Sequence, residues 1–279
     1  MVAPLREPAG VRCTVQNSPK WVAARDELER PNAARLYDYY LGGAHNFAVD
    51  REFAAGSPAL IPTAEMIQHS RAFLRRAVRA CVANGIRQFL DLGSGIPTAG
   101  NVHEVAHQDD PTCRVVYVDN DCATVAHGRT MLRDVANVAF AEADIRDAKA
   151  VLTSAEVTSL LDLSQPVAVL MVAILPYVFD DDSPVDVVAA YRDGIVPGSH
   201  LVLSHLTADN RPELVEELVR VSTQRMARIT ARSKAEVEPL LEGFDLLEPG
   251  LVLVSTWRGD GVPETDAETV SYGAVGVKR

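Results

Sequence analysis

From residue 86 onward, short apolar runs alternate with segments of helical periodicity, and this alternation restricts the possible folds more than any other feature. Strands separated by helices of about 10–15 residues indicate βαβ units, which build a parallel sheet. The chain is therefore predicted to be an α/β protein. We expect strands at five such runs: Gln88–Leu92, Val115–Val118, Ala139–Ala141, Val167–Ile174 and Leu201–Ser204.

Two further apolar runs, Phe244–Leu247 and Leu251–Trp257, are separated only by Glu248-Pro249-Gly250. A parallel crossover needs about a dozen residues or more, whereas an antiparallel hairpin needs only a few. We therefore predict that these two runs form an antiparallel hairpin at the end of a mostly parallel sheet.

Upstream of the sheet, the sequence predicts helices. One segment begins at Pro31 and stops at Gly42-Gly43, and proline at the start with glycine at the end is typical of a helix. Two more helical segments are Asn46–Ala55 and Ala64–Ala83, and the second has apolar residues at helical intervals.

Residues 1–30 have little periodicity apart from one helical turn near Trp21–Glu29. We expect them to form a loose arm. The chain is accordingly divided into an N-terminal arm (1–30), a helical N-terminal extension (31–85) and an α/β core (86–279).

The charge balance argues against nucleic acid as a partner. Lysine and arginine total 27 against 38 aspartate and glutamate residues, a formal net charge of −11, and no run of five basic residues occurs. The apolar stretch Val167–Leu175 is too short for a membrane span. Cys13, Cys81, Cys113 and Cys122 show no C-x-x-C spacing. We expect a cytoplasmic protein with reduced thiols and no membrane partner.

A glycine turn follows the first predicted strand. The chain reads Phe89-Leu-Asp-Leu-Gly-Ser-Gly-Ile-Pro-Thr98, so a buried strand runs into Gly93 and Gly95 before a helix at about Ala99–Gln108. Glycines at such a junction let the backbone approach a ligand closely, and open α/β sheets bind ligands at the carboxyl ends of their strands. The alternative is a tight strand–helix turn that binds nothing.

Carboxylates end the next two predicted strands. Asp119 follows Gly95 by 24 residues, close to the roughly 20 at which nucleotide-binding folds place an acid on the ribose hydroxyls. Asp144 ends the third strand and suits an adenine amino group; its alternative role is to cap a helix at Ala148–Leu152. A glycine turn followed by two such acids predicts an adenosine site.

The glycine turn also bears on which adenosine compound is bound. A dinucleotide favours G-x-G-x-x-G, in which the third glycine packs beside the pyrophosphate. Here the chain has Pro97 and Thr98, and the proline removes a backbone donor at the helix start. An adenosine ligand without phosphate fits better, and S-adenosylmethionine (SAM) is such a ligand.

These features resemble a class I SAM-dependent methyltransferase. Three further segments are similar to that superfamily: Ile174–Asp180 after the fourth strand, Ile195–Ser204 leading into the fifth, and Phe244–Trp257 as the antiparallel seventh strand. The resemblance implies a Rossmann-like fold. Its sheet would be seven-stranded and mostly parallel, in the order 3-2-1-4-5-7-6, with an antiparallel last strand and a helical N-terminal extension.

More narrowly, the chain resembles the actinobacterial "S-adenosyl methyltransferase" family, formerly a domain of unknown function, over about residues 31–258. The similar segments are Pro31–Asp50, Asn84–Asn101, Val102–Ala106, Val115–Asp121 and Ser204–Thr207. Pro97 departs from the superfamily's usual third glycine, and Pro176-Tyr177 replaces its usual His-His pair. The family does not imply a particular methyl acceptor.

The resemblance implies cofactor-binding roles for residues at the strand ends. Asp91 would hold the methionine ammonium of SAM, and the residues lining its methionine and sulfonium portion would be Gly93, Ser94 and Gly95. Asp119 would bind the ribose, with Asn120 beside the adenine. The residues at the adenine edge would be Asp144 and Ile145, and those beneath the methyl group would be Ala173 and Ile174.

The predicted N-terminal helices carry candidates for a lid. Tyr37 and Tyr40 are i, i+3 neighbours on one helix face, which fits either core packing at the sheet edge or contact with SAM or the acceptor. Asn46 and Arg71 are further candidates, with Arg71 pairing with the methionine carboxylate. Arg71 fits equally a salt bridge with Glu65 or a place in solvent. We predict a lid.

In-line methyl transfer requires the protein mainly to hold acceptor and methyl carbon about 3 Å apart and to exclude water. The catalytic residues are unknown. His205 is a candidate base, with a structural role as its alternative; His45 and His69 are further candidates. Asp180–Asp182 and Asp209-Asn210 carry the oxygen ligands that magnesium prefers, but the triplet also fits an ordinary loop and helix start. We predict no metal.

The sequence thus predicts a SAM-dependent methyltransferase that acts on an unidentified small-molecule acceptor. The alternatives are a regulatory SAM-binding protein without transferase activity and a methyltransferase of macromolecules. A closed pocket and an acidic surface favour the small molecule. The state of assembly is left open, with a homo-oligomer as one outcome.

Overall fold

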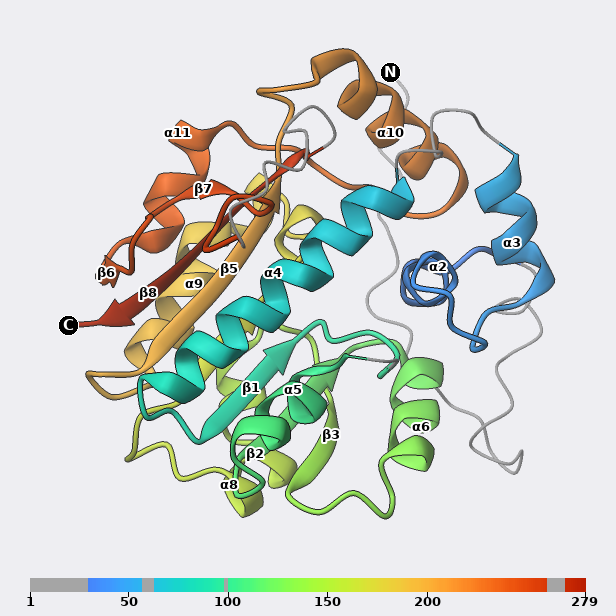
Figure 1. The fold of residues 1–279 in the computed structure, drawn as a ribbon. Helices are drawn as coiled ribbons and strands as arrows, with labels where there is room; N and C mark the ends of the chain where they lie inside the picture. Colours follow the sequence, from blue (N-terminus) through green and yellow to red (C-terminus); the bar gives the residue numbers. More distant parts are fainter. Residues whose placement is uncertain (1–29, 57–62, 98–99, 260–268) are drawn as a thin grey trace, which may run out of the picture.

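The computed structural model describes residues 30–56, 63–97, 100–259 and 269–279 (Figure 1). The helical turn predicted at Trp21–Glu29 lies outside the described residues, as does the predicted arm apart from Arg30. Thr98 of the glycine turn also lies outside them.

The described residues form one mixed sheet of eight strands, in the order β3-β2-β1-β4-β5-β8-β6, with β7 paired to β8. Neighbours from β3 to β5 are parallel, and β8 is antiparallel to β5 and β6. This order confirms the predicted Rossmann-like class I methyltransferase fold. The strands are β1 (Gln88–Leu92), β2 (Arg114–Asp119), β3 (Val138–Glu142), β4 (Ala168–Met171), β5 (His200–Leu206), β6 (Phe244–Leu246), β7 (Val252–Leu253) and β8 (Ser271–Lys278).

The predicted C-terminal hairpin is wrong. Strands β6 and β7 both pair with β8 rather than with each other, and most of the run Leu251–Trp257 is a turn. Strand β8 takes the place of the expected antiparallel strand beside β5. Its glycines explain the close packing, because a Cβ at Gly273 would meet the ring of Phe73 and one at Gly276 would meet Phe244.

Helices cover both faces of the sheet (Figure 1). One face packs against α4 (Thr63–Ala83), α5 (Val102–Asp109) and α6 (Cys122–Met131). The other packs against α7 (Ala148–Leu152), α8 (Ala155–Leu160), α9 (Pro184–Asp193) and α11 (Lys234–Val237). Short 3-10 helices are η2 (Leu175–Tyr177), η3 (Asp180–Asp182) and η4 (Glu238–Leu241). Because helices bury both faces, β1, β4 and β5 are buried along their whole length.

Three more helices form a third apolar cluster around Leu206, at the end of β5. They are α2 (Ala33–Tyr40), α3 (Ala48–Ala55) and α10 (Pro212–Arg225). Figure 1 shows α2 and α3 beyond the ends toward which the arrows of the parallel strands point. The three predicted N-terminal helices are confirmed as α2, α3 and α4, and α2 and α3 lie at the carboxyl edge of the sheet (Figure 1).

Among the described helices, none combines the length and the apolar character that a membrane crossing requires.

Candidate functional site

A cavity of about 380 Å³ lies at the carboxyl ends of β1, β2 and β4. Its lining comes from the glycine turn, the end of β2, the segment after β4 and the start of α2. It brings together nine of the twelve residues expected to bind the cofactor: Arg71, Asp91, Gly93, Ser94, Gly95, Asp119, Asn120, Ala173 and Ile174.

The glycine turn is tied to the neighbouring strand by its own backbone. The amides of Gly93 and Ser94 both donate to the carbonyl oxygen of Val118, at 2.8 and 3.1 Å. Gly93 has a φ of +65°, and a Cβ there would overlap the side chain of Ile174. Only glycine therefore allows the turn to lie this close to the segment that follows β4.

Asp119 lies at the end of β2 with its carboxylate directed at the glycine turn. Oδ2 accepts a hydrogen bond from the Gly95 amide at 2.9 Å, and Oδ1 accepts one from the Asp121 amide at 3.0 Å. Burial raises the pKa of this carboxyl group, while these amide hydrogen bonds lower it.

Asp91 and Arg71, the two residues predicted to bind the methionine portion of SAM, are both buried in the lining of this cavity. Asp91 is 8% exposed and Arg71 is 6% exposed. Burial raises the pKa of Asp91 to about 7, against the opposing effect of the Arg71 charge. Burial therefore opposes ionisation of Asp91, and any cation that binds beside it favours the carboxylate.

Arg71 has contacts that leave part of its guanidinium unused. Its Cζ lies 5.2 Å from the centre of the Tyr37 ring, and Nη1 donates to Asn101 Oδ1 at 3.3 Å. Its buried Nε has no hydrogen-bond partner among the described residues. Arg71 is thus buried rather than in solvent, and among the described residues it forms no salt bridge with Glu65. It presents an unsatisfied buried donor beside the cavity.

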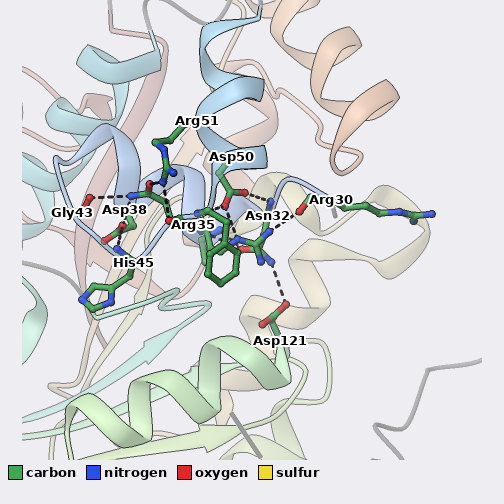
Figure 2. Close-up of polar contacts among 12 residues, drawn as sticks. Arg30, Asn32, Arg35, Asp38, Gly43, His45, Asp50, Arg51 and Asp121 are labelled. Atoms are coloured by element: carbon green, nitrogen blue, oxygen red, sulfur yellow. Dashed lines mark hydrogen bonds and ion pairs between the residues drawn. The ribbon is translucent and has the colours of Figure 1, made fainter. Parts of the chain in front are cut away.

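The start of α2 is held against the core by Asn32. Its Oδ1 caps the helix by accepting from the amides of Ala34 and Arg35, at 2.9 and 3.2 Å. Its Nδ2 donates to Oδ2 of Asp121 at 3.2 Å, across to the beginning of α6. Figure 2 shows this bond joining the N-terminal helices to the site. Tyr37, one turn further along α2, also lines the cavity.

A buried ion pair fixes α2 to α3 (Figure 2). Arg35 Nε donates to Asp50 Oδ2 at 2.7 Å, and both side chains are almost fully buried. Asp50 also accepts from the amides of Asn32 and Phe47. Asn46, expected in the lid, donates to Asp38 Oδ2 at 2.9 Å and so holds the turn between these helices without lining the cavity.

Three residues expected to bind the cofactor do not line this cavity: Tyr40, Asp144 and Ile145. The Asp144 carboxylate is paired with Arg146 Nη2 at 2.6 Å, and this pairing lowers its pKa. The alternative reading of Asp144 as a helix cap is wrong, because the cap of α7 is Asp147, whose side chain accepts from the Ala150 amide.

His205, the candidate base, is buried in the core away from the cavity. It is fully buried, its Nδ1 lies 2.8 Å from the Leu206 carbonyl oxygen and its Nε2 lies 2.8 Å from Arg232 Nη1. Burial lowers its pKa to about 4. With both ring nitrogens occupied by protein groups and no place in the cavity lining, His205 has a structural environment rather than a catalytic one.

The other histidine and metal candidates also have partners elsewhere. His45 lies 2.8 Å from His127, and His69 lies 3.1 Å from Thr269. Asp180 is paired with Arg232 at 2.6 Å, and Asp209 accepts from the Lys234 amide. The part of the chain that the structure describes contains no group of three or more histidine, cysteine, aspartate or glutamate residues arranged to hold a metal ion.

Several lining residues were not singled out in the sequence. Asn32 could have been found as the polar residue before a helix, and Tyr177 as the residue that replaces the usual histidine. Met226 and Ala227, just after α10, belong to no recognisable motif. They could not be predicted from the sequence, because only the path of the folded chain brings them to the cavity. Burial raises the pKa of Tyr177 to about 12, with the nearby Asp119 charge contributing.

Ala173, just after β4, has a strained backbone conformation. It has a φ of +60°, a left-handed conformation that costs a non-glycine residue about 1–2 kcal/mol. Its amide donates to Ser204 Oγ at 2.9 Å, which fixes the segment where it passes beneath the cavity. Such local strain is typical of functional sites.

Comparison with known proteins gives one family for almost the whole chain. The family model described as "S-adenosyl methyltransferase" matches residues 19–279. A DUF574 family protein from Streptomyces avermitilis MA-4680 is similar in structure, with 35% identity and a TM-score of 0.84 over 91% of this chain and 100% of that chain. A putative methyltransferase from Thermobifida fusca YX has 37% identity and a TM-score of 0.83 over 91% and 97%. A search of curated proteins found no significant match.

Proposed function

This chain belongs to the S-adenosyl methyltransferase family, and we propose that it binds SAM in the cavity at β1, β2 and β4 and transfers the methyl group to a small-molecule acceptor. One observation carries the proposal. A buried cation and a buried carboxyl, Arg71 and Asp91, lie on the same cavity as the glycine turn and the strand-ending Asp119.

The residues present fit such a ligand in size and chemistry. A cavity of about 380 Å³ lies within the roughly 300–1,000 Å³ typical of cofactor sites. The unpartnered Nε of Arg71 supplies a donor for an anionic group, and the Asp119 carboxylate in the cavity lining supplies an acceptor for a hydroxyl donor.

We assign the amino-acid portion of SAM to the Arg71 and Asp91 side. Arg71 would donate to the carboxylate, and Asp91 would accept from the ammonium in its ionised form. The raised pKa of Asp91 makes it responsive to that cation, because a neighbouring positive charge stabilises the carboxylate. Gly93, Ser94 and Gly95 would approach the same portion through their backbone.

We assign the adenosine portion to the end of β2. Asp119 would accept from the ribose hydroxyls, and Asn120 would flank the adenine. Asp144 and Ile145 are left out of the proposed set because neither lines the cavity. Asp121, which receives the hydrogen bond from Asn32, connects this end of the site to the cover formed by α2.

Bound there, SAM would supply a methyl group attached to a sulfonium sulfur. A lone pair of the acceptor would form the new bond to the methyl carbon, while the carbon–sulfur bond breaks and leaves its electron pair on sulfur. The protein's part is to position and to exclude water. Ala173 and Ile174 would form the floor, while Pro31, Asn32 and Tyr37 would close the opposite side. No base is assigned to His205, because both of its ring nitrogens are engaged with protein groups.

Incubation with methyl-labelled SAM and a fractionated metabolite extract tests this function. We expect label in a low-mass organic product, and slower transfer at limiting SAM concentration by an Asp119→Ala variant that remains folded. Label recovered in protein or nucleic acid would instead support a macromolecular acceptor. Tight SAM binding without transfer to any fraction would support the regulatory alternative.

A further inference from the structure

A second, smaller cavity adjoins the proposed SAM site. Its volume is about 170 Å³, and it lies among α2, α4, α10 and the segment after β4. Five residues line both cavities: Ala33, Tyr37, Ala173, Tyr177 and Met226. The two cavities therefore meet across one shared wall, next to the floor assigned to the methyl group.

The chemistry of the second cavity differs from that of the first. Leu36, Phe53, Ile67 and Leu218 are among its side chains, and none of the described residues that line it is aspartate, glutamate, lysine, arginine or histidine. A charged ligand would lose its hydration there without gaining a partner of opposite charge, which is strongly unfavourable. The lining therefore selects an uncharged, mostly apolar ligand.

One polar atom in this cavity lacks a partner. Ser70 of α4 is 6% exposed, and its Oγ has no hydrogen-bond partner among the described residues. By contrast, Ser222 on the opposite side donates to the Ala227 carbonyl oxygen at 2.8 Å. Buried hydroxyls are nearly always hydrogen-bonded, so the unpaired Ser70 marks a point where a ligand would supply the missing partner.

We propose that this second cavity is the methyl-acceptor site, and that the acceptor is an uncharged, apolar compound of about one ring whose single polar group hydrogen-bonds to Ser70. The size follows from the volume, since a dry apolar cavity of about 150 Å³ accommodates benzene. The inference rests on the proposed function, because only a methyl donor in the first cavity makes its neighbour an acceptor site.

Fluorine NMR with matched single-ring probes tests the chemistry of the cavity. The probes are 4-fluoroaniline, which is uncharged at neutral pH, and 4-fluorobenzoate, which is an anion. The protein is first saturated with S-adenosylhomocysteine, the product of SAM, so that no transfer occurs. We expect the fluoroaniline signal to broaden or shift with a saturable dependence on concentration and the fluorobenzoate signal to stay unchanged. Equal binding of the two probes, or binding of neither, overturns the proposal.

Two variants locate the bound probe. Leu218→Phe fills the cavity from α10 and is expected to weaken fluoroaniline binding by about tenfold or more, because a full cavity cannot take an added ring without strain. Ser70→Ala removes one hydrogen bond and is expected to weaken it by about three- to tenfold. The control Leu214→Phe lies one turn earlier on α10 and does not line the cavity; it should leave binding unchanged.

Titration of the same variants with SAM separates this inference from the function on which it rests. Leu218 and Ser70 line only the second cavity, so we expect wild-type SAM affinity in both variants. If the wild type binds SAM but Leu218→Phe and Leu214→Phe bind fluoroaniline equally well, the acceptor site is wrong and the SAM site stands. If the wild type does not bind SAM, the proposed function itself fails.

Discussion

Replacing Gly93 with alanine tests the close contact between the glycine turn and the segment after β4. Gly93 has a φ of +65°, and this left-handed conformation costs an alanine about 1–2 kcal/mol. The added Cβ would also overlap the side chain of Ile174, and such overpacking costs about 1–3 kcal/mol more. We expect the free energy of unfolding to fall by about 2–5 kcal/mol in total.

Gly42 offers a matched control for the backbone strain alone. Its φ is +77°, and no atom lies within 4 Å of a Cβ added there. Gly42→Ala should therefore cost only about 1–2 kcal/mol. Urea denaturation followed by circular dichroism gives both values. If Gly93→Ala is no more destabilising than Gly42→Ala, the contact with Ile174 does not restrict the turn as described.

Three further predictions concern ligand binding. Asp119→Ala should weaken SAM binding by about 1–3 kcal/mol because ribose hydroxyls lose their acceptor, while the variant still unfolds cooperatively; unchanged affinity by calorimetry would remove this acid from the ribose site. Because the pKa of Asp91 is raised to about 7 and the ammonium of SAM favours the ionised form, affinity should rise between about pH 6 and about pH 7.5; the same increase in Asp91→Asn would refute this. Saturating SAM should slow amide hydrogen exchange over residues 37–53. Tyr37→Ala should weaken SAM binding more than Tyr40→Ala, since of the two tyrosines only Tyr37 lines the first cavity. Exchange rates that SAM does not change would mean that α2 only covers the edge of the sheet.

The parts of the fold and site that were predictable depend on local signals. Buried parallel strands have nearly continuous apolar runs, so β1 to β5 could be located from the sequence alone. Parallel strands also end at one edge of the sheet, which is why Asp91, Gly93 and Asp119 could be expected to lie together. Their cavity-lining positions follow from this geometry, while their roles toward SAM stay predictions.

The failures come from information that is not local. No strand was predicted at Ser271–Lys278. Its two glycines leave the space that Phe73 and Phe244, distant in sequence, occupy. The Asp144 carboxylate pairs with Arg146, two residues later, and does not line the cavity. His205 could not be separated from a base by its sequence, because its burial and its contact with Arg232 arise only in the folded chain.

Isothermal titration calorimetry with SAM and with NAD tests the central claim most directly, because the site is assigned to an adenosine ligand without phosphate. We predict micromolar-range binding of SAM and of S-adenosylhomocysteine, with no heat from NAD. Arg71→Met should weaken SAM binding by about tenfold or more, whereas the control Arg79→Met, on the exposed side of the same helix, should bind SAM like the wild type. Tight binding of NAD without heat from SAM, or the same SAM affinity in both arginine variants, would contradict the assignment.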